Sequence, residues 1–325
     1  MRYYFAPMEG VTGYIYRNAH HDFFPGIDKY FAPFISPSNN GAFHPKELRD
    51  VMPENNPDLV LIPQILANRA DYFIQAANDL KKLGYEEINL NLGCPSGTVV
   101  AKKKGAGFLE NTEALDAFLD EIFQKTTQKI SIKTRIGKNS PEEFEKLLQI
   151  YNQYPLEELI IHPRIQKDFY KNQPNLSVFS QALKTSRNPV CYNGDLFTKG
   201  DYDRFCGRYA DVDCVMMGRG LIGNPGLVCQ IKGEKGAAKE HLQAFHQRLY
   251  QDYKAILSPE KIVLCKMKEV WSYMADSFTN SEKIRKKIRK VQTPGDYQVL
   301  VSRIFREESL LWERDEGKQE IDTKI

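Results

Sequence analysis

Residues 86–98 read EEINLNLGCPSGT, and this stretch indicates the fold class that the rest of the chain follows. Apolar and polar residues alternate over residues 88–92, which predicts a β-strand. Gly93, Cys94 and Pro95 then end the strand in a turn that presents the Cys94 thiol. The ordinary alternative is a structural cysteine, since unpaired cysteines are among the most buried residue types. Asn91 places an amide at the same strand end, so the motif favours a thiol with a chemical role.

Eight stretches of the sequence predict strands, and helical stretches separate most of them. A strand followed by a helix about every thirty residues is typical of βαβ units. Eight such units predict an α/β fold, the (β/α)8 TIM barrel. The alternative is an open doubly wound sheet, but residues 6–10 (APMEG) lack the glycine fingerprint expected after its first strand. The strands are expected at residues 3–6, 29–34, 59–64, 87–92, 130–135, 159–162, 190–193 and 212–217, and helices at 69–83, 112–126, 141–154 and 198–209.

After residue 233 the sequence changes from alternating strand patterns to helical periodicity. Apolar residues recur there at spacings of three and four, which predicts amphipathic helices. We therefore expect two domains, a catalytic barrel over residues 1–235 and an all-helical domain over residues 236–325, whose last thirteen residues are polar. The four helices of this second domain are expected at residues 239–255, 259–275, 281–290 and 294–312.

The composition is that of an ordinary globular protein. Of its 325 residues, 42% are hydrophobic and 27% are charged, and no apolar stretch is long enough to cross a membrane. The first residues, MRYYFAPMEG, do not resemble a secretion signal. Six cysteines are scattered without metal-site or disulfide spacing. These features predict a cytoplasmic protein without a bound metal, and we assume a monomer.

Polar or glycine-rich motifs follow nearly every predicted strand. In a TIM barrel the carboxyl ends of the strands form one rim, and active sites lie on that rim. Each residue alone has an ordinary explanation, such as a solvated lysine, a core histidine or a tight turn. Together they favour an active site built from Pro7, Met8, Glu9, Gln64, Asn91, Cys94, Lys133, His162, Arg164, Asn193, Gly194, Asp195, Gly218 and Arg219.

Two of these motifs predict a phosphate site. Residues 193–195 (NGD) and 218–220 (GRG) follow the last two predicted strands. In barrels the loops after those strands often bind phosphate through backbone N–H groups, and Arg219 adds a guanidinium that can donate twice. A cofactor that carries a phosphate group follows from this pattern.

The rim motifs resemble those of the tRNA-dihydrouridine synthases. They are APMEG at 6–10, NLGCP at 91–95, KTR at 133–135, HPR at 162–164, NGD at 193–195 and GRG at 218–220, in the family's order over the whole barrel. The helical region resembles that family's RNA-recognising domain. The resemblance implies an FMN-dependent oxidoreductase that uses NADPH to reduce a tRNA uridine, expected in the D-loop, to 5,6-dihydrouridine.

The resemblance also implies roles for the rim residues. Cys94 would donate the proton, while Asn91 and Arg164 would contact the substrate, although Pro163 and Ile165 beside Arg164 depart from the family's pattern. Pro7, Met8 and Glu9 would line the flavin, Gln64, Lys133 and His162 would contact its ring edge, and Asn193, Gly194, Asp195, Gly218 and Arg219 would hold the ribityl phosphate.

Two other functions remain open from the sequence. A flavin barrel that acts on a small molecule would need the same rim but not the helical region. An RNA-binding protein could keep the barrel as a scaffold without catalysis, and it would purify without flavin colour.

Positive charge is concentrated in the helical region. Residues 281–290 (SEKIRKKIRK) place six basic side chains around two isoleucines. Residues 261–306 contain eleven basic and four acidic residues, a net charge of +7, whereas the whole chain carries only +3. The ordinary alternative is a solvated helix face. Because the expected substrate is a polyanion, we predict that Lys286, Lys287 and Lys290 contact tRNA phosphates.

Overall fold

The structure is a computed structural model that describes residues 1–38 and 43–312. Its chain divides into two compact units, and each unit draws on separate segments of the sequence. The expected domain boundary at residue 235 divides the sequence into two continuous parts. The two compact units are defined by contacts between residues instead, so the two divisions differ. That boundary stays a prediction, and the polar segment 313–325 lies outside the described residues. The first unit is Met1–Pro7, Asp28–Asp195 and Arg208–Met217, and the second is Met8–Ile27, Leu196–Gly207 and Gly218–Ile325.

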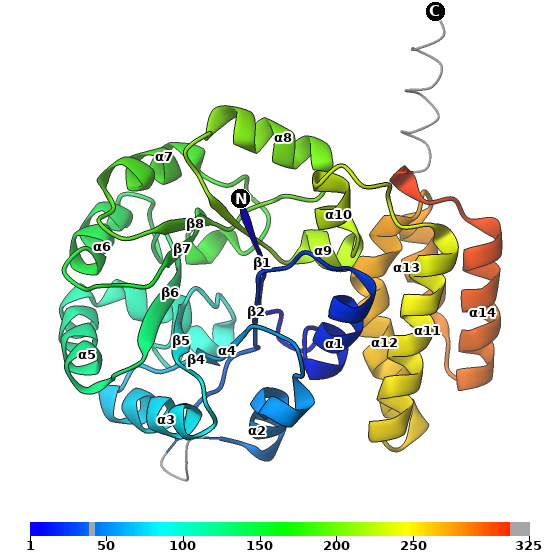
Figure 1. The fold of residues 1–325 in the computed structure, drawn as a ribbon, viewed down its shortest axis with the longest axis horizontal. Coiled ribbons are helices and arrows are strands. Elements are labelled where there is room, and N and C mark those ends of the chain that lie inside the picture. The colour runs from blue at the N-terminus through cyan, green and yellow to red at the C-terminus, as the bar shows by residue number, and fades with distance from the viewer. Residues whose placement is uncertain (39–42, 313–325) are drawn as a thin grey trace, which may run out of the picture. The chain divides into compact units, whose positions relative to one another are not determined.

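The first unit contains a ring of parallel strands with helices around its outside (Figure 1). The strands are β1 (Arg2–Phe5), β2 (Lys29–Phe31), β3 (Leu61–Ile62), β4 (Gln64–Ile65), β5 (Glu87–Leu92), β6 (Lys129–Arg135), β7 (Leu159–His162), β8 (Val190–Tyr192) and β9 (Cys214–Met217). They are hydrogen-bonded in the order β3-β2-β1-β9-β8-β7-β6-β5-β4. A parallel ring of this kind is the predicted TIM-barrel fold.

One predicted strand is divided in the structure. The stretch expected at residues 59–64 forms β3 and β4, separated by Pro63. Proline has no N–H to contribute to the strand ladder, and its ring fixes φ, so the pairing is interrupted there. β3 pairs with β2, and β4 pairs with β5. The divided strand therefore occupies one position of the ring, and the eight-position barrel that the sequence predicts is confirmed.

Helices with one apolar face surround the ring of the first unit. In α5 (Thr112–Lys125) the buried residues Leu115, Phe118, Leu119 and Ile122 recur at helical spacing. The side chain of Asn111 caps this helix by accepting a hydrogen bond from the Ala114 N–H at 3.0 Å. The other helices of this unit are α2 (Pro45–Val51), α3 (Ala70–Lys82), α4 (Gly97–Val100), α6 (Glu143–Tyr151) and α7 (Leu176–Thr185), with 3-10 turns η1 (Pro53–Asn55), η2 (Gly105–Glu110) and η3 (Gln166–Asp168).

The second unit is helical, as the sequence predicts for the carboxyl-terminal region. Its helices are α1 (Tyr14–Phe23), α9 (Arg219–Gly223), α10 (Leu227–Ile231), α11 (Lys239–Ile256), α12 (Glu260–Met274), α13 (Ser281–Lys290) and α14 (Pro294–Glu307), with η4 (Ala275–Ser277) and most of α8 (Lys199–Arg208). Tyr16 of α1 contacts Phe245 of α11 edge-on, with ring centroids 5.6 Å apart. Across the described residues, no helix combines the length and apolarity needed to cross a bilayer.

The last helix is shorter than the sequence predicts. The pattern predicted a helix to residue 312, but α14 ends at Glu307 and Glu308 has an extended backbone. Leu310, which is fully buried, instead forms an antiparallel bridge with Phe278. The helical prediction was wrong there because burial of Leu310 against another segment replaces further helical hydrogen bonds.

Two histidines are buried in the second unit. His246 accepts a hydrogen bond from the Trp271 Nε1–H at 3.2 Å and lies 2.7 Å from the Tyr297 hydroxyl. His20 lies 3.2 Å from the carbonyl oxygen of Pro225. Burial lowers the pKa of each histidine to about 3, well below the usual value of 6.5. Both side chains are therefore neutral in the folded protein at neutral pH.

We expect this pair to make the protein sensitive to mild acid. Between pH 6.5 and 3 the unfolded chain binds protons that the folded chain does not, so stability is complete above the unfolded pKa and falls as pH drops through this window. Each histidine should shift the folding equilibrium by up to about tenfold per pH unit. Urea unfolding at a series of pH values measures this slope. His246→Phe should flatten the slope; equal slopes in this variant and the wild type would contradict the assignment.

Candidate active site

Polar side chains form a connected network across the interior of the first unit. Gln64 of β4 donates from Nε2 to Asn89 Oδ1 at 2.7 Å, and Asn89 of β5 donates to the Ser131 hydroxyl at 2.9 Å. Asn91 donates from Nδ2 to Gln64 Oε1 at 2.7 Å. Strand register places Gln64 opposite Asn89 and Asn89 opposite Ser131. The network fixes which atom of each buried amide donates and which accepts.

The Asn91 side chain also organises the turn that carries Cys94. Its Oδ1 accepts the Gly93 N–H at 3.0 Å and the Cys94 N–H at 2.9 Å. The buried Arg135 of β6 donates from Nε to the Gly93 carbonyl oxygen at 3.0 Å. These bonds hold the backbone on the amino-terminal side of the half-buried Cys94 thiol. The turn predicted after residue 92 is therefore a restrained segment at the end of β5.

Gly105 supports this turn, and the sequence reasoning missed it. The Ala106 N–H donates to the Cys94 carbonyl oxygen at 3.1 Å. A Cβ on Gly105 would lie 2.9 Å from that oxygen and 3.1 Å from Cys94 Cβ, and its φ of +55° favours glycine. The available clue was the segment 102–107 (KKKGAG), whose two glycines follow the cysteine motif.

Gly105→Ala should therefore displace the Cys94 turn. We expect activity on the substrate to fall on the order of tenfold or more, because small misplacements of reacting groups are costly. Unfolding should show a modest loss of stability from the strained φ. Gly84→Ala is a matched control, since Gly84 also has a positive φ of +94° but no atom within 4 Å of a Cβ. Equal activities of the two variants would show that Gly105 does not support the turn.

Lys133 of β6 places an ammonium among these groups. Burial lowers its pKa to about 8, and the positive charge of Arg135 acts in the same direction. Among the described residues, no hydrogen bond or ion pair involves its Nζ atom. Because a half-buried ammonium loses part of its hydration when it is left unpaired, this group is suited to meeting an electron-rich ligand.

The buried His162 and Arg164 form a second group with the half-buried Asp195. Arg164 donates from NH1 to Asp195 Oδ1 at 2.9 Å and from NH2 to the other carboxylate oxygen, and from Nε to the Asn172 carbonyl oxygen at 2.6 Å. Its NH1 also lies 3.0 Å from His162 Nε2. A guanidinium can only donate, so His162 Nε2 accepts and the ring proton is on Nδ1. Arg164 is 1% exposed, and its bonds to Asp195 hold its guanidinium where it orients the His162 ring.

Two exposed aromatic residues lie beside this group and were not predicted as site residues. Phe169 and Tyr170 are 44% and 45% exposed. Arg135 holds them, because its NH2 donates to the Phe169 carbonyl oxygen at 2.8 Å and its guanidinium lies 5.5 Å from the Tyr170 ring centroid. The Tyr170 and His162 ring centroids are 6.0 Å apart. Exposed rings held by a buried arginine suit the stacking of a planar ligand.

The motif after β8 is tied to the barrel wall. Asn193 donates from Nδ2 to the Met216 carbonyl oxygen of β9 at 2.8 Å. A Cβ on Gly194 would lie 2.0 Å from the Tyr192 hydroxyl, so only glycine fits there. Asn193 and Gly194 therefore present backbone groups, while the Asp195 carboxylate is paired with Arg164.

The remaining predicted rim residues follow β1 and β9. Pro7 is half-buried in the first unit, whereas Met8, Glu9, Gly218 and Arg219 belong to the second. Within the second unit the Met8 N–H donates to the Thr12 hydroxyl at 2.8 Å, and Gly10, at φ +81°, accepts from Lys266 at 2.6 Å. The Arg219 guanidinium lies 5.1 Å from the Phe197 ring centroid. Gly218 is the N-cap residue immediately before α9.

The basic helix α13 buries its two isoleucines and exposes its lysines. Ile284 and Ile288 are each 1% exposed. A shallow hollow of about 390 Å³ is lined by Glu282, Lys283, Lys286, Lys287 and Lys290. Arg285 is paired with Asp276 and Glu282. In the described part of the chain, the side chains of Lys286, Lys287 and Lys290 form no hydrogen bond or ion pair, so their charges are available to an anion.

Comparison with known proteins identifies relatives of this chain. The model of the dihydrouridine synthase (Dus) family matches residues 4–309. A probable tRNA-dihydrouridine synthase of Staphylococcus aureus (strain COL) is 29% identical over 233 residues, which are 68% of each chain. The tRNA-dihydrouridine synthase B of Pasteurella multocida is 25% identical over 228 residues, 70% of this chain and 67% of its own.

Solved structures share the barrel at low sequence identity. A morphinone reductase variant in complex with tetrahydroNAD has a TM-score of 0.52 and 13% identity, and covers 73% of this chain and 88% of its own. The old yellow enzyme from Trypanosoma cruzi has a TM-score of 0.50 and 10% identity, over 74% and 91% of the two chains. At such identities the likeness supports the fold alone.

Proposed function

This chain belongs to the dihydrouridine synthase family, and from that premise we propose that it reduces the C5–C6 double bond of tRNA uridines to give 5,6-dihydrouridine. The observation that carries the proposal is the match of the family over residues 4–309, which includes both the barrel rim and the basic helices. We further propose a uridine of the D-loop as the substrate, NADPH as the reductant and the cytoplasm as the location.

The donor set of the rim fits a flavin, and we propose FMN. Lys133 supplies a half-buried ammonium without a described partner, and Gln64 of β4 and His162 of β7 supply oriented polar atoms. These three residues would contact the electron-rich edge of the ring, while Pro7, Met8 and Glu9 would line it. When bound and reduced, FMN supplies the hydride for C6 of the uracil. The protein residues supply binding, orientation and the proton.

We propose Cys94 as the donor of the proton to C5. A thiol keeps its proton near neutral pH, since the unperturbed pKa of cysteine is about 8.5. The Cys94 backbone is held by Asn91 Oδ1 and by the Ala106 N–H, so the thiol is offered from a fixed turn. Asn91 remains a proposed contact of the base, and its bonds to the turn give it a second, positioning role.

We assign Arg164 and Asp195 to the positioning of His162. The bidentate pair between them uses the arginine donors that a substrate would need, and the carboxylate would repel a phosphate. The ribityl phosphate would therefore meet the backbone N–H groups of residues 193–194, together with Gly218 and Arg219. His162 would offer its Nδ1–H to the flavin.

The substrate base must leave its stack to reach the rim, which costs a few kcal/mol. Loops of tRNA reduce this cost because their bases are already partly unstacked. Phe169 and Tyr170 are exposed at the site and would stack on the extruded base. Lys286, Lys287 and Lys290 would neutralise phosphates elsewhere on the tRNA.

Mapping of dihydrouridine in tRNA tests the proposal directly. A strain that lacks the gene should lose dihydrouridine at one or more positions, and the purified protein with NADPH should restore it on that tRNA. The measurement also identifies the position. If the dihydrouridine content of tRNA is unchanged in that strain but NADPH reduces the flavin of the purified protein, the small-molecule oxidoreductase is favoured. A colourless protein that binds tRNA would favour the non-catalytic alternative.

Arg219→Ala should weaken FMN retention. The substitution removes a charge-assisted hydrogen bond worth about 1.5 to 3 kcal/mol, which corresponds to roughly ten- to hundredfold in affinity. The fraction of flavin that the protein releases on dilution measures the loss of affinity. Arg204→Ala removes an exposed arginine of α8 that is paired with Asp201, so it serves as the matched control. Retention equal to that of the wild type would show that Arg219 does not contact the phosphate.

A further inference from the structure

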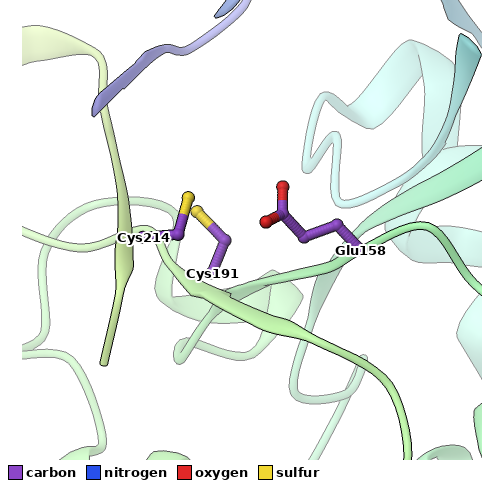
Figure 2. A group of neighbouring side chains, drawn as sticks. All are labelled: Glu158, Cys191 and Cys214. Carbon is purple, nitrogen blue, oxygen red and sulfur yellow. The ribbon is translucent and has the colours of Figure 1, made fainter. Parts of the chain in front are cut away.

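A second cluster of reactive side chains lies in the barrel interior, apart from the rim groups. The ligand atoms of Glu158, Cys191 and Cys214 all lie within 4.8 Å of one another. Figure 2 shows the two sulfur atoms side by side, with the Glu158 carboxylate facing them. All three residues are buried, at 0 to 1% exposure. The proposed reaction uses none of them.

Strand register explains how the three residues meet. Glu158 precedes β7, Cys191 is in β8 and Cys214 is the first residue of β9. Tyr192 pairs with Val215, so Cys191 and Cys214 are neighbours on adjacent strands. Glu158 and Ile160 point inward together because side chains alternate along a strand. His162 ends the same strand at the rim, so the cluster lies toward the amino end of the barrel interior.

The Glu158 carboxylate is only half satisfied. Its Oε1 lies 3.1 Å from Arg2 and accepts from the Tyr4 hydroxyl at 3.3 Å. Its Oε2 is buried and has no hydrogen-bond partner among the described residues. Such an orphan carboxylate oxygen is costly to bury. The groups around the thiols are mainly apolar, so they do not supply the missing partner.

We propose that Glu158, Cys191 and Cys214 bind a thiolate-preferring divalent metal ion, with Zn²⁺ as the physiological candidate. Two thiolates and a carboxylate are ligands that Zn²⁺ accepts. A tetrahedral zinc ion spaces such ligand atoms at about 3.5 to 3.8 Å, so small side-chain movements close the site.

Charge balance supports this occupant. Binding releases the two thiol protons to solvent, because the ligands are thiolates. Two thiolates, one carboxylate and Zn²⁺ carry a net charge of −1, and the Arg2 guanidinium, which pairs with Glu158 and also with the exposed Asp213, offsets part of it. The ion would link β7, β8 and β9 at the end of the barrel opposite the rim, which is a structural role, with a water molecule or the second Glu158 oxygen as its fourth ligand. The competing explanation is that both thiols pack as ordinary core residues.

Zinc content tests the proposal on the full-length protein with its flavin. The protein is refolded in the presence of FMN with Zn²⁺ as the only added metal, dialysed against metal-free buffer and analysed by mass spectrometry for zinc per chain. We expect one tightly held ion in the wild type and none in the Cys191→Ser/Cys214→Ser variant. Glu158→Gln should weaken zinc retention by at least the roughly 10- to 100-fold seen when groups around a metal are removed. Co²⁺ in place of Zn²⁺ should give thiolate charge-transfer absorption.

A matched control removes two other thiols. Cys206→Ser/Cys265→Ser changes a half-buried and an exposed cysteine and should keep the zinc ion. Flavin content and circular dichroism show whether each variant is folded. If the double cysteine variant does not fold, the zinc content of Glu158→Gln shows whether these residues bind the ion. A wild type without zinc, or equal zinc in Glu158→Gln and wild type, would overturn the assignment and leave the thiols as core residues.

Discussion

Cys94→Ala should lower the rate of dihydrouridine formation by about 10²- to 10⁴-fold, the usual contribution of a general acid. FMN binding and its reduction by NADPH should be unchanged, because the thiol acts only on the substrate. Single-turnover experiments separate the steps: flavin reduction is followed after mixing with NADPH, and flavin reoxidation after mixing with tRNA. We expect a normal first step and a slow second step.

Two controls define this result. Cys265→Ala removes an exposed thiol of α12 and should leave both steps unchanged. Cys94→Ser keeps a hydroxyl in place of the thiol, which is a much weaker acid, and should recover little of the rate. A fully active Cys94→Ala variant would remove this residue from the mechanism and place the proton donor elsewhere on the rim.

Replacement of Lys286, Lys287 and Lys290 by Glu should weaken tRNA binding and flatten its dependence on salt. Each phosphate that the protein neutralises adds about −0.9 for duplex, or −0.7 for single strands, to the slope of log K against log salt. Loss of three contacts should therefore reduce the slope by roughly two to three units. Binding measured over a salt series gives both the affinity and the slope. Flavin reduction by NADPH should not change.

A second triple variant serves as the matched control. Lys125→Glu, Lys146→Glu and Lys184→Glu make the same change of charge on exposed lysines of α5, α6 and α7. If this variant lowers the salt slope as much as the α13 variant, net charge rather than α13 determines binding. Replacement of the three α13 lysines by Gln separates lost attraction from new repulsion. An unchanged slope would show that the tRNA binds another surface.

The sequence by itself determined the features that depend on neighbouring residues. Strand β5 occupies residues 87–92 and β7 residues 159–162 as predicted, because the alternation of apolar and polar residues in β5 and the short apolar run of β7 are visible within a few residues. The turn at Cys94 is equally local, since glycine and proline end the strand. Basic residues at helical spacing likewise indicated the exposed face of α13.

Only the tertiary structure decided which distant side chains meet. Arg164 pairs with Asp195 across 31 positions of sequence, and Arg135 bonds the Phe169 carbonyl oxygen across 34. Glu158, Cys191 and Cys214 come together from three strands without any recognisable spacing in the sequence. The physical reason is that strand tilt and register determine which inward positions share a layer of the barrel, and these depend on the pairing of all the strands.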